Sequence, residues 1–199
     1  FKMISEVNTF VDIHHKNLHD EEKLGQIFGK DDKQTRFLCG LIVHTADISN
    51  PTRVWDISLT LANNIVEEFF RQGDKELERG LPISPGLFDR KTVSIPKSQL
   101  GFIEFVVAPL ISGVVAMFSH LYRMGVNIAH NHQTWQNRYV ETLPLEQRAG
   151  EKIALQKRFK ALQAKFPSEE QVKKIEQEIE EEHLSVSVKM VRAVNACGL

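Results

Sequence analysis

The sequence is poor in cysteine, and the two cysteines that it has are far apart. Cys39 and Cys197 are the only ones among 199 residues. Two thiols at this separation build neither a disulfide framework nor a zinc knuckle, so a small extracellular disulfide scaffold is excluded. We expect a reducing, cytoplasmic setting, with any membrane association arising from regions outside this chain.

The sequence also lacks an excess of either charge. It has 25 basic and 26 acidic residues, for a formal net charge of -1. No overall field would attract a nucleic acid polymer or an anionic membrane surface. An anionic ligand would therefore need a local positive feature, such as a bound metal ion.

Long hydrophobic runs are missing as well. The most apolar stretch, Phe105 to Phe118, is fourteen residues long and contains Pro109 and Gly113. A bilayer needs about 20 apolar residues in a helix, so this stretch predicts a buried helix and no membrane span. The chain opens Phe1-Lys2-Met3 without a basic and apolar leader, and we expect it to be a piece of a longer protein.

What is present is helical periodicity in a chain with enough apolar material for one ordinary core. Hydrophobic residues make up 42% and charged residues 26% of the sequence. This composition is typical of a globular protein, and the spacing of apolar residues predicts an all-α fold. We expect a compact domain over residues 1–150 and a charged helical tail over residues 151–199 that packs on the domain or on a partner helix.

A helix that ends beside a proline carries the first candidate ligand. Apolar and small residues recur at helical spacing before this end: Leu38, Leu41, Ile42, Thr45 and Ala46. Because Asn50 precedes Pro51, the helix should finish near Ser49, which places Asp47 in the last turn. A carboxylate is disfavoured at a helix C-terminus, and a metal ion would offset that cost. The alternative is an exposed aspartate with His44 one turn before it.

The next helical segment runs from Ile57 to Arg71 and has two adjacent apolar edges. One edge holds Leu61, Ile65 and Phe69, and the other holds Ala62, Val66 and Phe70. This width predicts a helix buried on more than one side. Glycines and prolines then mark a loop that runs to about Ile95, and a loop of this length is more often functional than accidental.

Pro96 opens a further helix that presents an amide and an aromatic ring together. Gln99, Phe102, Ile103 and Val106 share one face. A side-chain amide has both a donor and an acceptor and could pair with a purine edge while the ring stacks on the base. A polar helix start followed by core aromatics is the alternative.

Three segments of the sequence carry a resemblance when taken together: His44 to Pro51, Glu67 to Asp74 and Lys97 to Ile103. In their order and spacing they resemble the class I 3',5'-cyclic nucleotide phosphodiesterase catalytic domain. The resemblance implies an all-α fold of the HD type and a signal-transduction hydrolase that converts cAMP or cGMP to the 5'-monophosphate. It further implies two divalent metal ions, one zinc-type and one magnesium-type, and a histidine as general acid.

The resemblance assigns roles to five positions. Asp47 matches a ligand of the zinc-type metal. Gln99 matches the glutamine that hydrogen-bonds the purine, Phe102 the aromatic half of the clamp around the base, and Ile65 its aliphatic half. Asn50 matches an asparagine near the adenine, which favours cAMP only weakly because dual-specificity members also carry it.

The earlier motifs of that family are missing here. No histidine-asparagine motif carries a general acid, and Asp20 belongs to no ligand motif because Lys23 stands where a second histidine would be needed. We therefore expect the carboxyl-terminal portion of a catalytic domain, which holds a purine pocket and one metal ligand and is inactive alone. The run His130-Asn131-His132 fits no ligand spacing and is expected on a polar helix surface.

Two other functions remain open. The chain could be a non-catalytic helical interaction module that retains the phosphodiesterase scaffold and engages a homodimer or a partner helix through its tail. It could also be a metal-dependent phosphohydrolase for another nucleotide, which would use Asp47 without needing Gln99 and Phe102 together.

Overall fold

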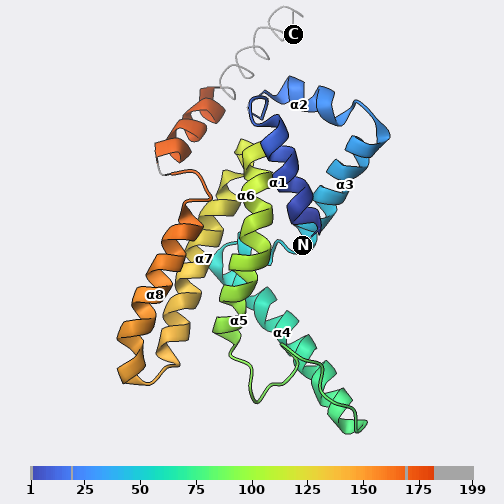
Figure 1. The fold of residues 1–199 in the computed structure, drawn as a ribbon. Helices are drawn as coiled ribbons and strands as arrows, with labels where there is room; N and C mark the ends of the chain where they lie inside the picture. Colours follow the sequence, from blue (N-terminus) through green and yellow to red (C-terminus); the bar gives the residue numbers. More distant parts are fainter. Residues whose placement is uncertain (1, 19, 169, 182–199) are drawn as a thin grey trace, which may run out of the picture. The chain divides into compact units, whose positions relative to one another are not determined.

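The computed structural model describes residues 2–18, 20–168 and 170–181, and within these residues it consists of helices and their connections, with no strand. The all-α prediction is confirmed. Two compact units are distinguished, Phe1–Phe166 and Pro167–Leu199, and each is considered by itself. The elements of the first unit (Figure 1) are α1 (Lys2–His14), α2 (Glu21–Phe28), α3 (Asp32–Asp47), the 3-10 turn η1 (Asn50–Thr52), α4 (Trp55–Glu78), α5 (Ile95–Phe102), the π-turn η2 (Ile103–Val107), α6 (Ala108–Met117), the 3-10 turn η3 (Ser119–Leu121), α7 (Tyr122–Glu141) and α8 (Leu145–Gln163).

Aspartates start two of the first three helices. The Asp20 carboxylate accepts from the Lys23 backbone N–H at the start of α2, and Asp31 accepts from the Gln34 N–H at the start of α3. Each satisfies one donor that a helix N-terminus leaves without a partner. Asp20 therefore has a structural role at the start of α2.

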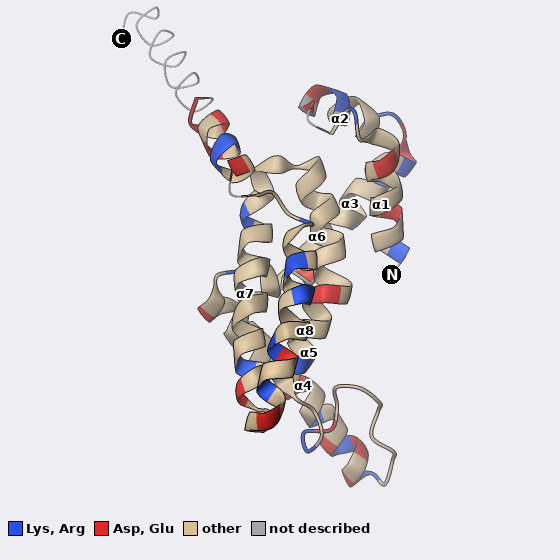
Figure 2. Cartoon of the chain, turned by 60° about the vertical axis from the view of Figure 1, so that its left-hand side comes forward, with Lys and Arg blue, Asp and Glu red and all other residues tan. Residues whose placement is uncertain are grey.

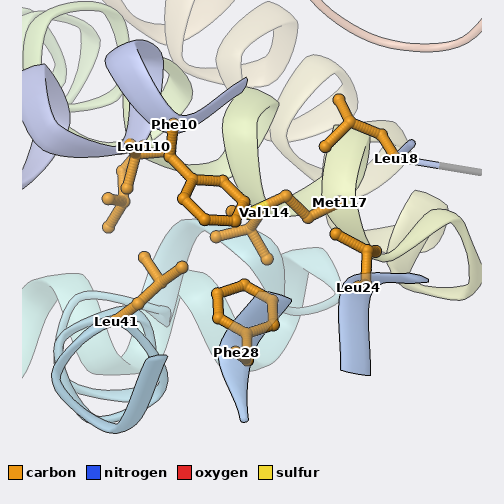
Figure 3. Packing of buried hydrophobic residues seen from close by; sticks show 9 residues of the cluster. Phe10, Leu18, Leu24, Phe28, Leu41, Leu110, Val114 and Met117 are labelled. Carbon is orange, nitrogen blue, oxygen red and sulfur yellow. The ribbon is translucent and has the colours of Figure 1, made fainter. Parts of the chain in front are cut away.

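One apolar core joins α1, α2, α3 and α6 (Figure 3). The Phe10 and Phe28 rings stack with centroids 5.0 Å apart, and Leu41 and Leu110 are almost completely buried beside them. Helices α1 and α6 pack especially closely, because a Cβ placed on Gly113 would lie 2.2 Å from Val7 Cγ1. Helix α6 has no charged residue, as Figure 2 shows, which suits its central position.

Helices α5 and α6 form one continuous helix with a π-turn between them. Within this turn the Ala108 N–H donates to the Ile103 carbonyl, five residues back. Pro109 has no backbone N–H to donate to an α-helical hydrogen bond. The wider π-turn accommodates this missing bond without ending the helix. The predicted helix over Phe105 to Phe118 is thus wrong in its bounds, and Phe105 itself is 65% exposed.

The continuous helix is long enough to raise the question of a membrane. Among the described residues, Ile95–Met117 is the one helix whose length and composition would allow a span, and 56% of its most apolar window is buried in the structure. Core helices of soluble proteins have the same properties. The helix alone is therefore weak evidence for a membrane span.

Helix α4 is buried on one edge only. Ala62, Val66 and Phe70 are buried, but Leu61 and Ile65 on the neighbouring edge are partly solvent-exposed, Ile65 at 39%. The prediction of burial on more than one side is therefore wrong for this structure. Together with the exposed Ile57, these residues leave an apolar stripe at four-residue steps.

Helices α7 and α8 pack side by side in the first unit (Figure 1). Leu155 and Leu162 of α8 are buried, and Gln136 of α7 donates from Nε2 to the Leu155 carbonyl at 2.8 Å. Residue 150 thus lies inside a helix that packs on α7, and the first compact unit extends to Phe166.

The second unit begins with a reciprocal helix cap. The Gln171 backbone N–H donates to Ser168 Oγ, and Gln171 Oε1 accepts from the Ser168 N–H. This pattern is a capping box, and a helix follows over residues 170–181. The predicted helix start after Pro167 is confirmed. A homodimer or partner helix engaged through the tail stays a prediction, and Cys197 lies outside the described residues.

Candidate functional site

Asp47 is the last residue of α3, and its side chain is exposed. The helix closes with the Ile48 N–H donating to the His44 carbonyl at 3.2 Å. Asp47 therefore stands at the negative end of the helix, as Pro51 predicted. Within the described part of the chain, no group of three or more His, Cys, Asp or Glu side chains is placed to hold a metal ion. One carboxylate can supply one ligand but does not make a metal site.

Asn50 lies just beyond, in the buried turn η1, and is 8% exposed. Its Oδ1 is buried and has no hydrogen-bond partner among the described residues. The turn is fixed from α7, since Asn127 Nδ2 donates to the Thr52 carbonyl at 2.9 Å. Asn131 Nδ2 donates to the carbonyls of Pro51 at 2.8 Å and Arg53 at 2.7 Å.

Gln99 lies in α5, on the helix that Pro96 opens. The Gln99 side chain is 6% exposed, and Phe102 is partly buried one turn later. Helix α5 packs against α7, so both purine-side candidates, Asn50 and Gln99, belong to elements that contact the same helix.

The π-turn that follows Phe102 is anchored by a partly buried network of charged and polar side chains. Glu104 Oε1 lies 2.6 Å from His132 Nε2 of α7, and Glu104 Oε2 accepts from Arg158 Nη2 of α8 at 2.6 Å. The His132 side chain is completely buried, and its ring stacks on Phe159. Three helical segments therefore meet at one carboxylate.

Two opposing effects act on the Glu104 carboxyl. Burial is the largest influence and raises its pKa, but the hydrogen bonds from His132 and Arg158 together outweigh burial. The net result is a pKa below the ordinary value of 4.5, so Glu104 is ionised near neutral pH. A buried carboxylate with partners on both oxygens is a strong positional anchor.

The loop over residues 79–94 is fastened back onto α4. Arg90 pairs with Asp74 at 2.6 Å and with Glu67 at 3.3 Å. Hydrogen bonds from Arg90 hold the pKa of the Asp74 carboxyl below its usual range, and hydrogen bonds from Arg71 and then from Arg90 do the same for Glu67. The loop also approaches the helix closely at Gly73, where a Cβ would lie 2.0 Å from the Phe88 carbonyl oxygen. The loop position is therefore fixed by contacts at several points.

A small cavity lies beside the carboxyl end of α3. Its volume is about 180 Å³, and its lining includes Leu41, Thr45, Ser49, Val114, Phe118 and Met124. None of the five predicted site residues lines it. A shared cleft between Asp47 and Gln99 stays a prediction, as does the role of the partly exposed Ile65.

Sequence reasoning missed the residues of α7 that hold the site elements in place. Asn131 and His132 are fully buried, which overturns their expected position on a polar surface. The signal was present, because both lie between the buried Ile128 and Trp135 at spacings of three and four residues. Because both side chains are polar, they were not counted in the periodic pattern of buried residues.

Comparison with known proteins agrees with the resemblance in the sequence. A family model described as 3'5'-cyclic nucleotide phosphodiesterase matches residues 1–128. The chain is 54% identical over 69 residues to the human dual specificity calcium/calmodulin-dependent 3',5'-cyclic nucleotide phosphodiesterase 1C, covering 35% of this chain and 10% of that protein. A bovine 1B relative is 51% identical over 72 residues, covering 36% of this chain and 13% of that protein.

A solved structure gives the same result for the fold. It is LmjPDEB1 in complex with IBMX, with a TM-score of 0.51 and 27% sequence identity, covering 65% of this chain and 39% of that one. The matches to the curated relatives thus span only about a tenth of their length. On the family match and the shared helical fold, the chain belongs to the 3',5'-cyclic nucleotide phosphodiesterase family.

Proposed function

We propose that this chain is a carboxyl-terminal part of a catalytic domain that hydrolyses 3',5'-cyclic nucleotides to 5'-monophosphates. The substrate-binding residues are Asn50, Ile65, Gln99 and Phe102, and Asp47 is a metal ligand. Because the names of the 1B and 1C relatives specify dual specificity, both cAMP and cGMP are the proposed substrates. The proposed setting is cytoplasmic.

The observation that carries this proposal is the buried, unpartnered acceptor of Asn50. Leaving such an acceptor without a donor costs about 1 to 3 kcal/mol, so a ligand donor at this position would recover free energy. The exocyclic amine of adenine is a donor of the required kind. Gln99 lies on α5, which contacts the same helix α7, and its side-chain amide offers both a donor and an acceptor to a purine edge.

For the metal, the proposal is limited to Asp47. Two divalent ions, one zinc-type and one magnesium-type, would require further ligands from residues other than those described, together with a general acid. The chain is therefore proposed to supply the purine side of the site, and no catalytic step is assigned to a metal held by this chain alone.

A second candidate function is a non-catalytic interaction module. The exposed apolar stripe Ile57, Leu61 and Ile65 on α4 favours it, since such a surface can receive another helix. The same stripe would equally seat another part of a catalytic domain. The two functions differ in whether Asp47 ever becomes part of a metal centre.

The deciding experiment is an assay of the full-length protein with cAMP and with cGMP, before and after treatment with a chelator. We expect 5'-monophosphate formation that is lost on chelation and restored by adding zinc and magnesium. No turnover after metal is restored would reject the enzymatic function and favour the interaction module.

A further inference from the structure

Two asparagines on α7 donate hydrogen bonds to three successive backbone carbonyls at the turn that carries Asn50. Asn127 binds the Thr52 carbonyl, and Asn131 binds the carbonyls of Pro51 and Arg53. Asn127 and Asn131 are four residues apart, so their side chains project from the same face of the helix. The contacts join segments that are 75 to 80 residues apart in the sequence.

These carbonyls need partners because they fall between two helical ladders. In η1 the Thr52 N–H donates to Ser49 and the Arg53 N–H to Asn50, and the ladder of α4 begins at the Val54 carbonyl, which accepts from Ser58. The carbonyls of residues 51–53 therefore lie outside both ladders. A buried carbonyl without a donor is costly, so the two amides determine where this turn can lie.

The same helix also fixes the position of the segment that carries Gln99. The neighbour of Asn131, His132, holds Glu104 at 2.6 Å in the π-turn directly after Phe102. Helix α7 thus contacts the Asn50 turn through two asparagines and the Gln99 segment through a histidine. Three residues within two helical turns set the separation between the two candidate purine contacts.

From this geometry we propose that Asn127 and Asn131 are positioning residues for cyclic nucleotide recognition. They fix the position of the Asn50 turn relative to Gln99 and do not contact the nucleotide themselves. This inference rests on the proposed function. Asn131 should matter more than Asn127, because it is fully buried and donates two hydrogen bonds where Asn127 donates one.

The test compares Asn131→Ala, Asn127→Ala and the control Asn137→Ala in the full-length protein. Asn137 is an exposed asparagine on the same helix. Because small misplacements at a binding site are costly, we expect KM for the preferred nucleotide to rise about tenfold in Asn131→Ala and about threefold in Asn127→Ala, with kcat changed by less than about twofold. The control should leave both constants unchanged.

A double mutant separates positioning from general destabilisation. If Asn131 acts through Asn50, adding Asn131→Ala to Asn50→Ala should raise KM by less than about twofold, because the group being positioned is already gone. A multiplicative effect in that background would overturn the inference. So would a lower melting temperature with an unchanged KM in both single mutants.

An unfolded variant and an inactive wild-type protein have different consequences for the positioning role. If Asn131→Ala does not fold, Asn127→Ala, which breaks a single partly buried bond, decides the matter by the same KM criterion. If the wild-type protein turns over neither nucleotide with metal present, the proposed function fails and the inference fails with it. Wild-type turnover with an unshifted KM in the variants rejects the positioning role alone.

Discussion

The carboxyl end of α3 and the meeting point of η2, α7 and α8 are both built around a carboxylate, but they differ in almost every physical respect. Asp47 is exposed at the unfavourable end of a helix dipole. Glu104 is largely buried, with 10% of its side chain exposed, and is bonded on both oxygens. The exposed Asp47 carboxylate can bind a ligand, whereas both oxygens of Glu104 already contact His132 and Arg158 and so stabilise the fold. Function and stability are therefore expected to respond to different substitutions in this chain.

The largest effect should follow removal of the exposed carboxylate. Asp47→Ala in the full-length protein is expected to abolish metal-dependent turnover, because Asp47 is the metal ligand that the proposed function assigns to this chain. As an exposed substitution, it should change the free energy of unfolding by no more than about 0.5 kcal/mol. Turnover and a denaturant titration measure the two halves of this prediction.

The matched control is Asp32→Ala, an exposed aspartate at the other end of the same helix. It should leave turnover unchanged. Normal turnover in Asp47→Ala would end the metal assignment.

The buried carboxylate should show the opposite pattern. Glu104→Ala leaves the buried His132 and the partly exposed Arg158 without their partner, and it should lower the free energy of unfolding by about 3 kcal/mol. Urea denaturation measures this loss. Glu141→Gln, at an exposed position of α7, is the control and should be nearly neutral. Equal stability of Glu104→Ala and wild type would show that the network does not anchor the π-turn.

Gln99→Ala tests the proposed contact with the purine base. Losing one or two hydrogen bonds in a buried pocket should weaken nucleotide binding by about 1 to 3 kcal/mol, with a smaller effect on kcat. Steady-state kinetics with cAMP and cGMP provide the measurement. Gln133→Ala, on the exposed side of α7, serves as the reference. An unchanged KM in Gln99→Ala would remove the purine assignment.

The smallest expected effect is a dependence of stability on pH. Because the pKa of Glu104 lies below 4.5 in the folded protein, its contribution is present above the unfolded value and is lost as the pH falls through the folded value. The stability difference between wild type and Glu104→Gln should therefore narrow as the pH is lowered beneath 4.5. Unfolding titrations at a series of acidic pH values measure it. A constant difference would contradict the assigned pairing.

Much of the backbone could be predicted because prolines and caps act locally. Pro51 ended α3 where expected, and Pro96 started α5. Pro109 lies inside a helix that continues, because the π-turn before it accommodates the missing hydrogen bond. Whether a local defect is absorbed or ends the helix depends on packing, which the sequence alone does not give.

The errors in burial have a common cause, which is that polarity was taken as a guide to exposure. Leu61 and Ile65 are apolar yet partly exposed, whereas Asn131 and His132 are polar yet fully buried. A polar side chain can be buried when its partners are present, and those partners, Pro51, Arg53 and Glu104, come from distant parts of the sequence. The site residues were named by resemblance, while the residues that position them emerged only from the tertiary contacts.

The π-turn also has a consequence for tolerance to insertion and deletion. One additional residue in a helical turn rotates everything after it by about 100° around the helix axis. Gln99 before the turn and Leu110 after it therefore point in directions that a plain α-helix of this length would not produce together. Deleting one residue of Ile103–Val107 would convert the π-turn to an α-turn and leave the core face of α6 toward α1, whereas deleting one residue elsewhere in α5 or α6 would turn that face by about 100°.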